Sequence, residues 1–177
     1  MSRQFWVENI IWSTADATPV ASTAAETIMF ADNTIPANYM ADGRVLRLRC
    51  FGKLSTTGTP TMTFSIRWGG VAGTLLAVTE AMTMGSGVAN VNWELNAIIQ
   101  TRANGATGSL LVMGFAQIHT SATAIVTNTF GVSGYDAPAA VTADLSIDKA
   151  LSVTATWSAS SASNTLTGMM YLLESLN

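Results

Sequence analysis

The clearest alternation of hydrophobic and polar positions lies between residues 44 and 70. Its apolar positions, at every second residue, are Leu46, Leu48, Cys50 and Leu54, and then Met62, Phe64, Ile66 and Trp68. Charged and hydroxyl side chains fill the positions between them, as in a strand with one buried face. Residues 55–60, which separate the two runs, are turn formers. The pattern predicts one long antiparallel hairpin at the centre of a β-sandwich.

Further segments predict more strands on either side of this hairpin. Alternation is clear in residues 88–97, 141–147 and 151–158, whereas residues 109–119 and 166–173 are apolar on both faces. The count is eight or nine strands, with no helix and no internal repeat. Long crossings among short strands favour a Greek-key or jelly-roll sandwich over an up-and-down barrel. We expect an all-β fold with a single antiparallel β-sandwich.

The first dozen residues concentrate aromatic and branched side chains ahead of a small, polar segment. Five of them are candidate contact residues: Phe5, Trp6, Ile10, Ile11 and Trp12. We interpret residues 1–25 as an extended N-terminal arm and linker, and residues 26–177 as the jelly-roll domain. Two roles stay open for the arm: it covers the end of its own sandwich, or it anchors the chain to a neighbouring subunit or a larger partner.

Composition adds an expectation about assembly. Hydrophobic residues make up 49% of the chain, charged residues only 11%, and the mean hydropathy is +0.34. No apolar run approaches the roughly 20 residues of a membrane helix, so we expect no membrane partner and attribute the excess to surfaces buried between subunits. The two segments that are apolar on both faces support a homo-oligomer, with a homotrimer as first choice.

The net charge of the chain argues against nucleic-acid binding. The net charge is −3, whereas nucleic-acid-binding proteins usually carry a basic footprint. Five of the eight basic residues do lie in the central segment, between Arg44 and Arg67. That cluster is either the solvated or subunit-facing side of a sheet, or a contact for an acidic partner surface. In the second case Arg47, Arg49 and Arg67 are the alternative contact residues to the arm.

Catalytic and metal motifs are sparse. With one histidine, His119, and one cysteine, Cys50, the chain cannot supply a marked catalytic triad or a typical zinc site. Asp32 with Asn33 and Asp144 with Asp148 are thin calcium candidates, and Glu80 with Glu94 is a carboxylate pair by residue type alone. The three tryptophans Trp68, Trp93 and Trp157 fall on apolar strand faces, which favours the core over a sugar-binding surface. We expect no enzyme and no cofactor.

The cysteine also bears on the compartment. A single cysteine on the apolar face of a strand excludes an internal disulfide, and the polar residues Glu8 and Asn9 interrupt any signal-peptide core. We therefore expect the protein to be made in a cytoplasm.

Four short runs carry a resemblance to a known family. They are residues 34–39 (TIPANY), 42–49 (DGRVLRLR), 55–61 (STTGTPT) and 66–70 (IRWGG). Together they resemble jelly-roll virion proteins of tailed bacteriophages, of the head decoration or cement type, over residues 26–120. The resemblance concerns scaffold and turns, so it transfers no site residues. It implies a small, often trimeric jelly-roll on the capsid surface of a virion, with the major capsid protein as its partner.

Other functions remain as alternatives. They are a tail component, a small capsid shell protein, or a receptor-binding or carbohydrate-binding jelly-roll module. A receptor-binding module is usually fused to an attachment domain, and the chain begins at Met1 without one. The sequence therefore favours the capsid decoration protein.

Overall fold

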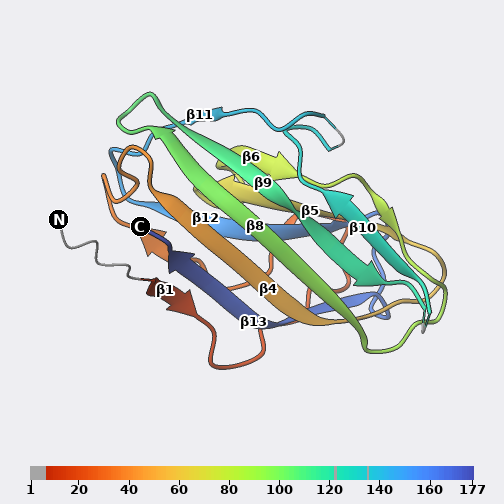
Figure 1. Ribbon diagram of the computed structural model, residues 1–177. Helices are drawn as coiled ribbons and strands as arrows, with labels where there is room; N and C mark the ends of the chain where they lie inside the picture. Colours follow the sequence, from red (N-terminus) through yellow and green to blue (C-terminus); the bar gives the residue numbers. More distant parts are fainter. Residues whose placement is uncertain (1–6, 122, 135) are drawn as a thin grey trace.

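The computed structural model describes residues 7–121, 123–134 and 136–177, and this part of the chain is built from strands without a helix (Figure 1). The strands are β1 (Glu8–Trp12), β2 (Thr27–Ile28), β3 (Thr34–Ile35), β4 (Val45–Ser55), β5 (Thr61–Trp68), β6 (Thr74–Val78), β7 (Met82–Thr83), β8 (Val91–Ala103), β9 (Gly108–His119), β10 (Ile125–Thr129), β11 (Val141–Ala143), β12 (Lys149–Trp157) and β13 (Thr165–Ser175). The predicted all-β class is confirmed.

Two antiparallel sheets pack face to face. The large sheet has the order β1-β13-β4-β8-β9-β10, with β11 also paired to β9. The small sheet has the order β2-β12-β5-β6, with β3 paired to β12 and β7 to β5. Figure 1 looks onto the large sheet, and the small sheet lies behind it. The predicted β-sandwich is confirmed.

The strand pairing is that of a jelly roll. The chain behaves as one long hairpin rolled up: β1 pairs with β13, β2 with β12, β4 with β8, and β5 with β6. These pairs alternate between the large and the small sheet, which produces two four-stranded layers with Greek-key connections. The strand β9 is added to the free edge of β8, and β10 and β11 pair with β9, which widens the large sheet.

The predicted central hairpin is wrong in its pairing. Both of its strands exist, but β4 lies in the large sheet and β5 in the small sheet, so they face each other across the core. The connection between β4 and β5 runs beside residues 85–88. The Thr56 N–H donates to the Val88 carbonyl at 2.9 Å, and the Thr56 hydroxyl donates to the Gly85 carbonyl at 2.5 Å. Alternation is identical for a hairpin and for a sheet-to-sheet crossing, so the pattern could not separate them.

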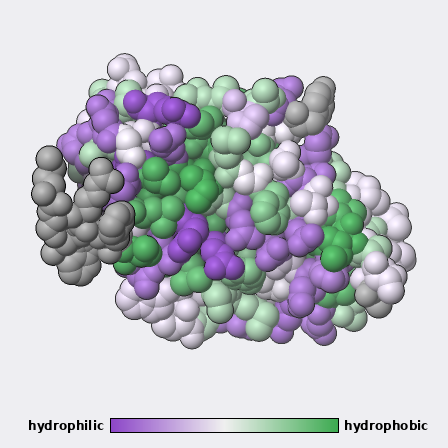
Figure 2. All heavy atoms as spheres, in the orientation of Figure 1, coloured by the Kyte–Doolittle hydropathy of each residue, from purple (hydrophilic) through white to green (hydrophobic). Residues whose placement is uncertain are grey.

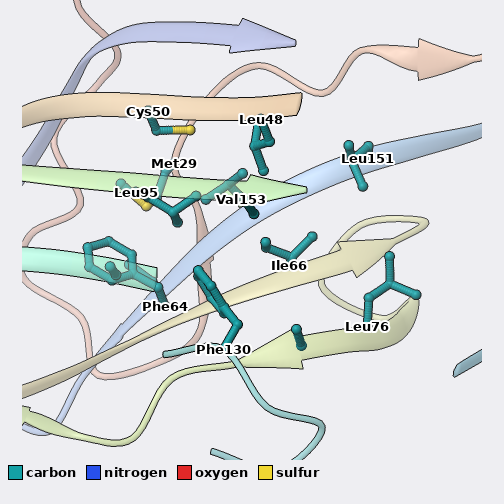
Figure 3. Packing of buried hydrophobic residues seen from close by; sticks show 14 of the residues in the cluster. Met29, Leu48, Cys50, Phe64, Ile66, Leu76, Leu95, Phe130, Leu151 and Val153 are labelled. Atoms are coloured by element: carbon teal, nitrogen blue, oxygen red, sulfur yellow. The ribbon is translucent and has the colours of Figure 1, made fainter. Parts of the chain in front are cut away.

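The core lies between the inward faces of the two sheets. Figure 3 shows Leu48 and Leu95 of the large sheet together with Ile66 and Val153 of the small sheet in the space between the strands, and all four side chains are buried. The three tryptophans predicted to be core are buried too, and each indole N–H finds a backbone carbonyl. Trp68 donates to Asp144, Trp93 to Thr167 and Trp157 to Val20, at 2.8, 3.2 and 3.2 Å.

Part of the predicted arm belongs to the sandwich. Residues 8–12 form β1, an edge strand that pairs with β13 across a bulge, and Ile10 and Ile11 pack partly against the core. The following linker continues along the same edge, where the buried Val20 forms an isolated bridge with Leu166. Residues 8–12 thus form an edge strand of the large sheet. Phe5 and Trp6 lie outside the described residues.

Candidate interaction face of the large sheet

The outer face of the large sheet carries most of the exposed large hydrophobic side chains. Nine such side chains occur among the described residues, and six of them point outward from this sheet: Trp12, Ile98, Met113, Ile125, Met169 and Met170. Figure 2 shows hydrophobic residues on this face in separate clusters with hydrophilic residues between them. Clusters of exposed apolar side chains are typical of surfaces that bind another protein.

One cluster lies on two neighbouring strands. The outward side chains Ile98 of β8 and Leu111, Met113 and Phe115 of β9 form what we call the β8–β9 patch. Ile98 and Met113 are register partners, so their side chains stand next to each other, and they are 39% and 53% exposed. A shallow hollow of about 170 Å³ lies between this patch and Arg47 on β4. The patch explains why the sequence of β9 is apolar on both faces.

Two of the predicted basic residues lie beside the patch. Arg47 Nε donates to Glu174 Oε2 at 2.7 Å, and Arg49 Nε donates to Asn96 Oδ1 at 3.1 Å. The hydrogen bond and charge of Glu174 raise the pKa of Arg47 above its ordinary value. Both guanidinium groups stay partly exposed, so each retains donors that a partner surface could use.

The third predicted basic residue lies elsewhere. Arg67 is on the outer face of the small sheet, where its Nε and Nη2 donate to the two carboxylate oxygens of Glu26 at 2.5 and 2.8 Å. Burial alone would raise the pKa of Glu26, but hydrogen bonds from Arg67 and Thr154 and the charge of Arg67 hold it below the ordinary value. The structure therefore does not bring Arg67 together with Arg47 and Arg49.

The outer face of the small sheet carries mainly polar side chains. The outward positions of β5 and β12 are Thr61, Thr63, Ser65, Arg67, Ala150, Ser152, Thr154 and Thr156. Segment 26–32 covers part of it, since Thr154 donates to Glu26 at 2.5 Å and Ser152 donates to Asp32 at 2.6 Å. These two hydroxyl groups are satisfied within the chain, and exposed apolar surface is concentrated on the opposite sheet.

A groove of about 610 Å³ crosses the outer face of the large sheet beside the β8–β9 patch. Its polar side chains are Asp16, Asn92, Glu94, Gln117 and His119. Gln117 donates to Thr127, but the side chains of the other four form no hydrogen bond or ion pair with any described residue. No lysine or arginine lines the groove, so its two carboxylates face the solvent without a cation in the lining.

Apolar side chains line the same groove between Asp16 and the polar residues of β8 and β9. Phe51 comes from β4, and Met169 and Met170 come from the bulge at which the register of β13 shifts. The bulge places two successive methionines at the surface, 43% and 47% exposed. Methionine is flexible and polarisable, which suits it to contact with varied apolar partners. The groove thus joins unpaired acidic groups to a deformable apolar wall.

The other candidates from the sequence serve the fold. Asp144 accepts hydrogen bonds from the N–H and hydroxyl of Ser146, Asp148 accepts one from the Ala37 N–H, and Asp32 binds Ser152. These carboxylates therefore organise loops, and no group of three potential metal ligands occurs among the described residues. Cys50 is a buried free thiol, as predicted.

Glu80 and Glu94 are not a pair. Glu94 lies on β8 of the large sheet, whereas Glu80 follows β6 of the small sheet.

In the described chain no helix has the length and apolar character needed to cross a membrane.

Sequence reasoning missed the groove. The outward residues Asn92 and Glu94 were visible only as the polar side of a strand, and His119 only as an isolated histidine. The groove becomes visible once β4, β8, β9 and β13 are known to be neighbours, because each contributes one part of its lining.

Comparison with protein-family models and with curated protein sequences finds no match to this chain.

Proposed function

We propose that this protein is a structural virion protein of the head decoration type, which binds the outer surface of a capsid and reinforces contacts between capsomers. Its partners are the major capsid protein and further copies of itself, in a homotrimer. The jelly-roll pairing supports the proposal, because this architecture recurs in viral capsid proteins, although it also occurs in lectins and enzymes.

The observation that carries the proposal is the unequal character of the two outer faces. Six exposed large hydrophobic side chains point outward from the large sheet, whereas the outward positions of β5 and β12 carry no large hydrophobic side chain and are Ser, Thr and Arg apart from Ala150. A decoration protein on a capsid needs one adhesive face and one face that remains in water. We assign the capsid contact to the β8–β9 patch together with Arg47 and Arg49.

This assignment gives Arg47 and Arg49 a larger part in the proposed contact than the arm. Ile10 and Ile11 are half buried against their own sandwich, so they have less surface to offer a capsid. Trp12 is 60% exposed beside β13 and can still join the contact. Two partly exposed arginines at the border of an apolar patch fit a capsid surface that combines apolar and acidic groups.

The test is co-sedimentation with capsids that lack the protein. Met113→Glu places a charge in the middle of the β8–β9 patch, and burial of a methionine contributes about 1.5–3 kcal/mol to an interface. We expect capsid affinity to fall by about tenfold or more. The matched control is Thr63→Glu, at an outward and partly exposed position of the small sheet. Equal binding of the Met113→Glu variant and the wild type would contradict the assignment, and so would a comparable loss for Thr63→Glu.

A further inference from the structure

The acidic groove of the large sheet has the properties of a docking site for an extended peptide segment. Its volume of about 610 Å³ falls in the range of ligand pockets in proteins. The side chains of Asp16, Asn92, Glu94 and His119 line it without a hydrogen-bond partner among the described residues. Phe51, Met169 and Met170, which come from the strands between Asp16 and Glu94, offer apolar surface. An occupant that satisfies both kinds of lining carries a cation next to large apolar side chains.

The chain itself contains such a segment. Residues 1–6, which lie outside the described residues, have the sequence Met-Ser-Arg-Gln-Phe-Trp. Arg3 is the first basic residue, and no other occurs before Arg44. Phe5 and Trp6 follow it closely, so one short stretch combines a guanidinium group with two aromatic rings. The guanidinium group matches the carboxylates of Asp16 and Glu94, and the rings match the methionine wall.

The position of β1 favours a groove on another copy. Glu8 pairs with Ser175, and β1 then runs along β13 toward the groove, so residues before Glu8 precede the strand at its far end. From Ser175 to Met170 the distance along β13 is about 17 Å at roughly 3.3 Å per residue. Six residues span at most about 20 Å when fully extended. To reach its own groove, the segment would have to reverse direction and run back fully extended, whereas a second copy can present its groove without this restriction.

We propose that residues 1–6 of one copy dock in the groove of a second copy, with Arg3 bound by Asp16 and Glu94 and with Phe5 and Trp6 against Phe51, Met169 and Met170. A contact of this kind is heterologous, because segment and groove are different surfaces, and such contacts close into rings when the rotation between copies permits. The inference concerns self-assembly and does not rest on the capsid role, because its experiments contain no capsid.

The first experiment is a charge exchange in the full-length chain, read by sedimentation equilibrium. Arg3→Glu should convert the wild-type oligomer to monomer at micromolar concentration, and so should the double variant Asp16→Lys/Glu94→Lys. Combining all three substitutions in one chain should restore the oligomer. Thr63→Lys, at a partly exposed outward position of the small sheet, is the control for a charge change away from the groove, and a cooperative unfolding transition in every variant establishes that the variants fold. A monomeric wild type, unchanged assembly in the charge variants, or no restoration would overturn the proposal.

A second experiment separates docking between copies from docking within one chain. Gln4→Cys and Asn92→Cys are made in separate full-length chains of different size, which leaves Arg3, Asp16 and Glu94 intact, and Cys50 is buried. Mixing the two under mild oxidation should give a covalent heterodimer on a denaturing gel. Gln4→Cys mixed with Thr63→Cys, which lies on the small sheet, is the control. A disulfide that forms only within a chain carrying both the Gln4→Cys and the Asn92→Cys substitutions, with none between chains, would overturn the proposal.

Discussion

The indole Nε1 of Trp93 donates a hydrogen bond of 3.2 Å to the carbonyl oxygen of Thr167, two strands away, by passing over Gly52 on the strand between them. Gly52 is the register partner of both Trp93 and Gly168. Because Gly52 has no side chain, the Trp93 ring can lie across β4. The hydrogen bond from Trp93 to Thr167 therefore links β8 to β13 across β4.

Gly52→Ala should destabilise the sandwich by about 1–3 kcal/mol or more, the usual effect of overpacking a dense core. The added Cβ would overlap the Thr167 carbonyl oxygen and lie 2.7 Å from Trp93 Nε1. Chemical denaturation measures the change. Lys53→Ala, on the outward side of the same strand, should stay within about 0.5 kcal/mol of the wild type. Equal stability of the two variants would refute this account of Gly52.

Trp68→Ala should lower the free energy of unfolding by about 3–5 kcal/mol, because it removes a buried aromatic side chain and its hydrogen bond to Asp144. Trp12→Ala is the natural comparison, since Trp12 is 60% exposed and Trp68 only 3%. We expect a loss below about 1 kcal/mol for Trp12→Ala. A loss that small for Trp68→Ala would place its ring outside the core.

The free energy of unfolding should depend on pH through the carboxyl group of Glu26. Its pKa in the folded protein lies below 4.5, so its ionised form stabilises the fold above that pH, and the contribution is lost as pH falls through the folded-state pKa. The excess stability of the wild type over Glu26→Gln should therefore be present at neutral pH and shrink below about pH 4.5. Thermal unfolding as a function of pH measures it.

Arg67→Gln provides the control for this titration. Without the guanidinium group, burial of Glu26 opposes ionisation and only the hydrogen bond from Thr154 favours it. The acid dependence caused by Glu26 should then become small or change sign. An unchanged pH profile in the Arg67→Gln background would mean that Arg67 is not the cause of the lowered pKa.

Cys50 should react with thiol reagents only when the protein opens. Its burial raises the pKa of the thiol well above the ordinary value, so little reactive thiolate is present, and the side chain is inaccessible. A colourimetric disulfide reagent should label the native protein slowly and the denatured protein at once. Labelling at the same rate in both states would contradict the buried position of Cys50.

The sequence was informative about strands and faces because a period of two is a local property. Leu48, Cys50 and Trp68 were assigned to the core from their spacing alone, and all three are buried. Pairing is not local. The turn formers at residues 55–60 fit a hairpin as well as a crossing. The structure has the crossing, in which Thr56 donates hydrogen bonds to Gly85 and Val88, far along the chain.

The candidate site was harder to predict for the same reason. The doubly apolar sequences of β9 and β13 indicated a surface that another protein covers, and Met113 and Met170 are indeed exposed. The separation of Arg67 from Arg49 depends on the sheet to which each strand belongs, and the bulge at Met169 depends on register. Both are properties of the assembled fold that spacing along the chain does not encode.

The most direct measurement of the proposed role is cryo-electron microscopy of the native virus particle from which this protein is isolated. The account predicts copies bound to the outer capsid surface with the large sheet facing the capsid, Met113 and Ile98 in the contact, and Thr63 and Thr156 of the small sheet turned toward solvent. A particle on which the small sheet makes the contact, or on which the protein is absent from the capsid, would contradict it.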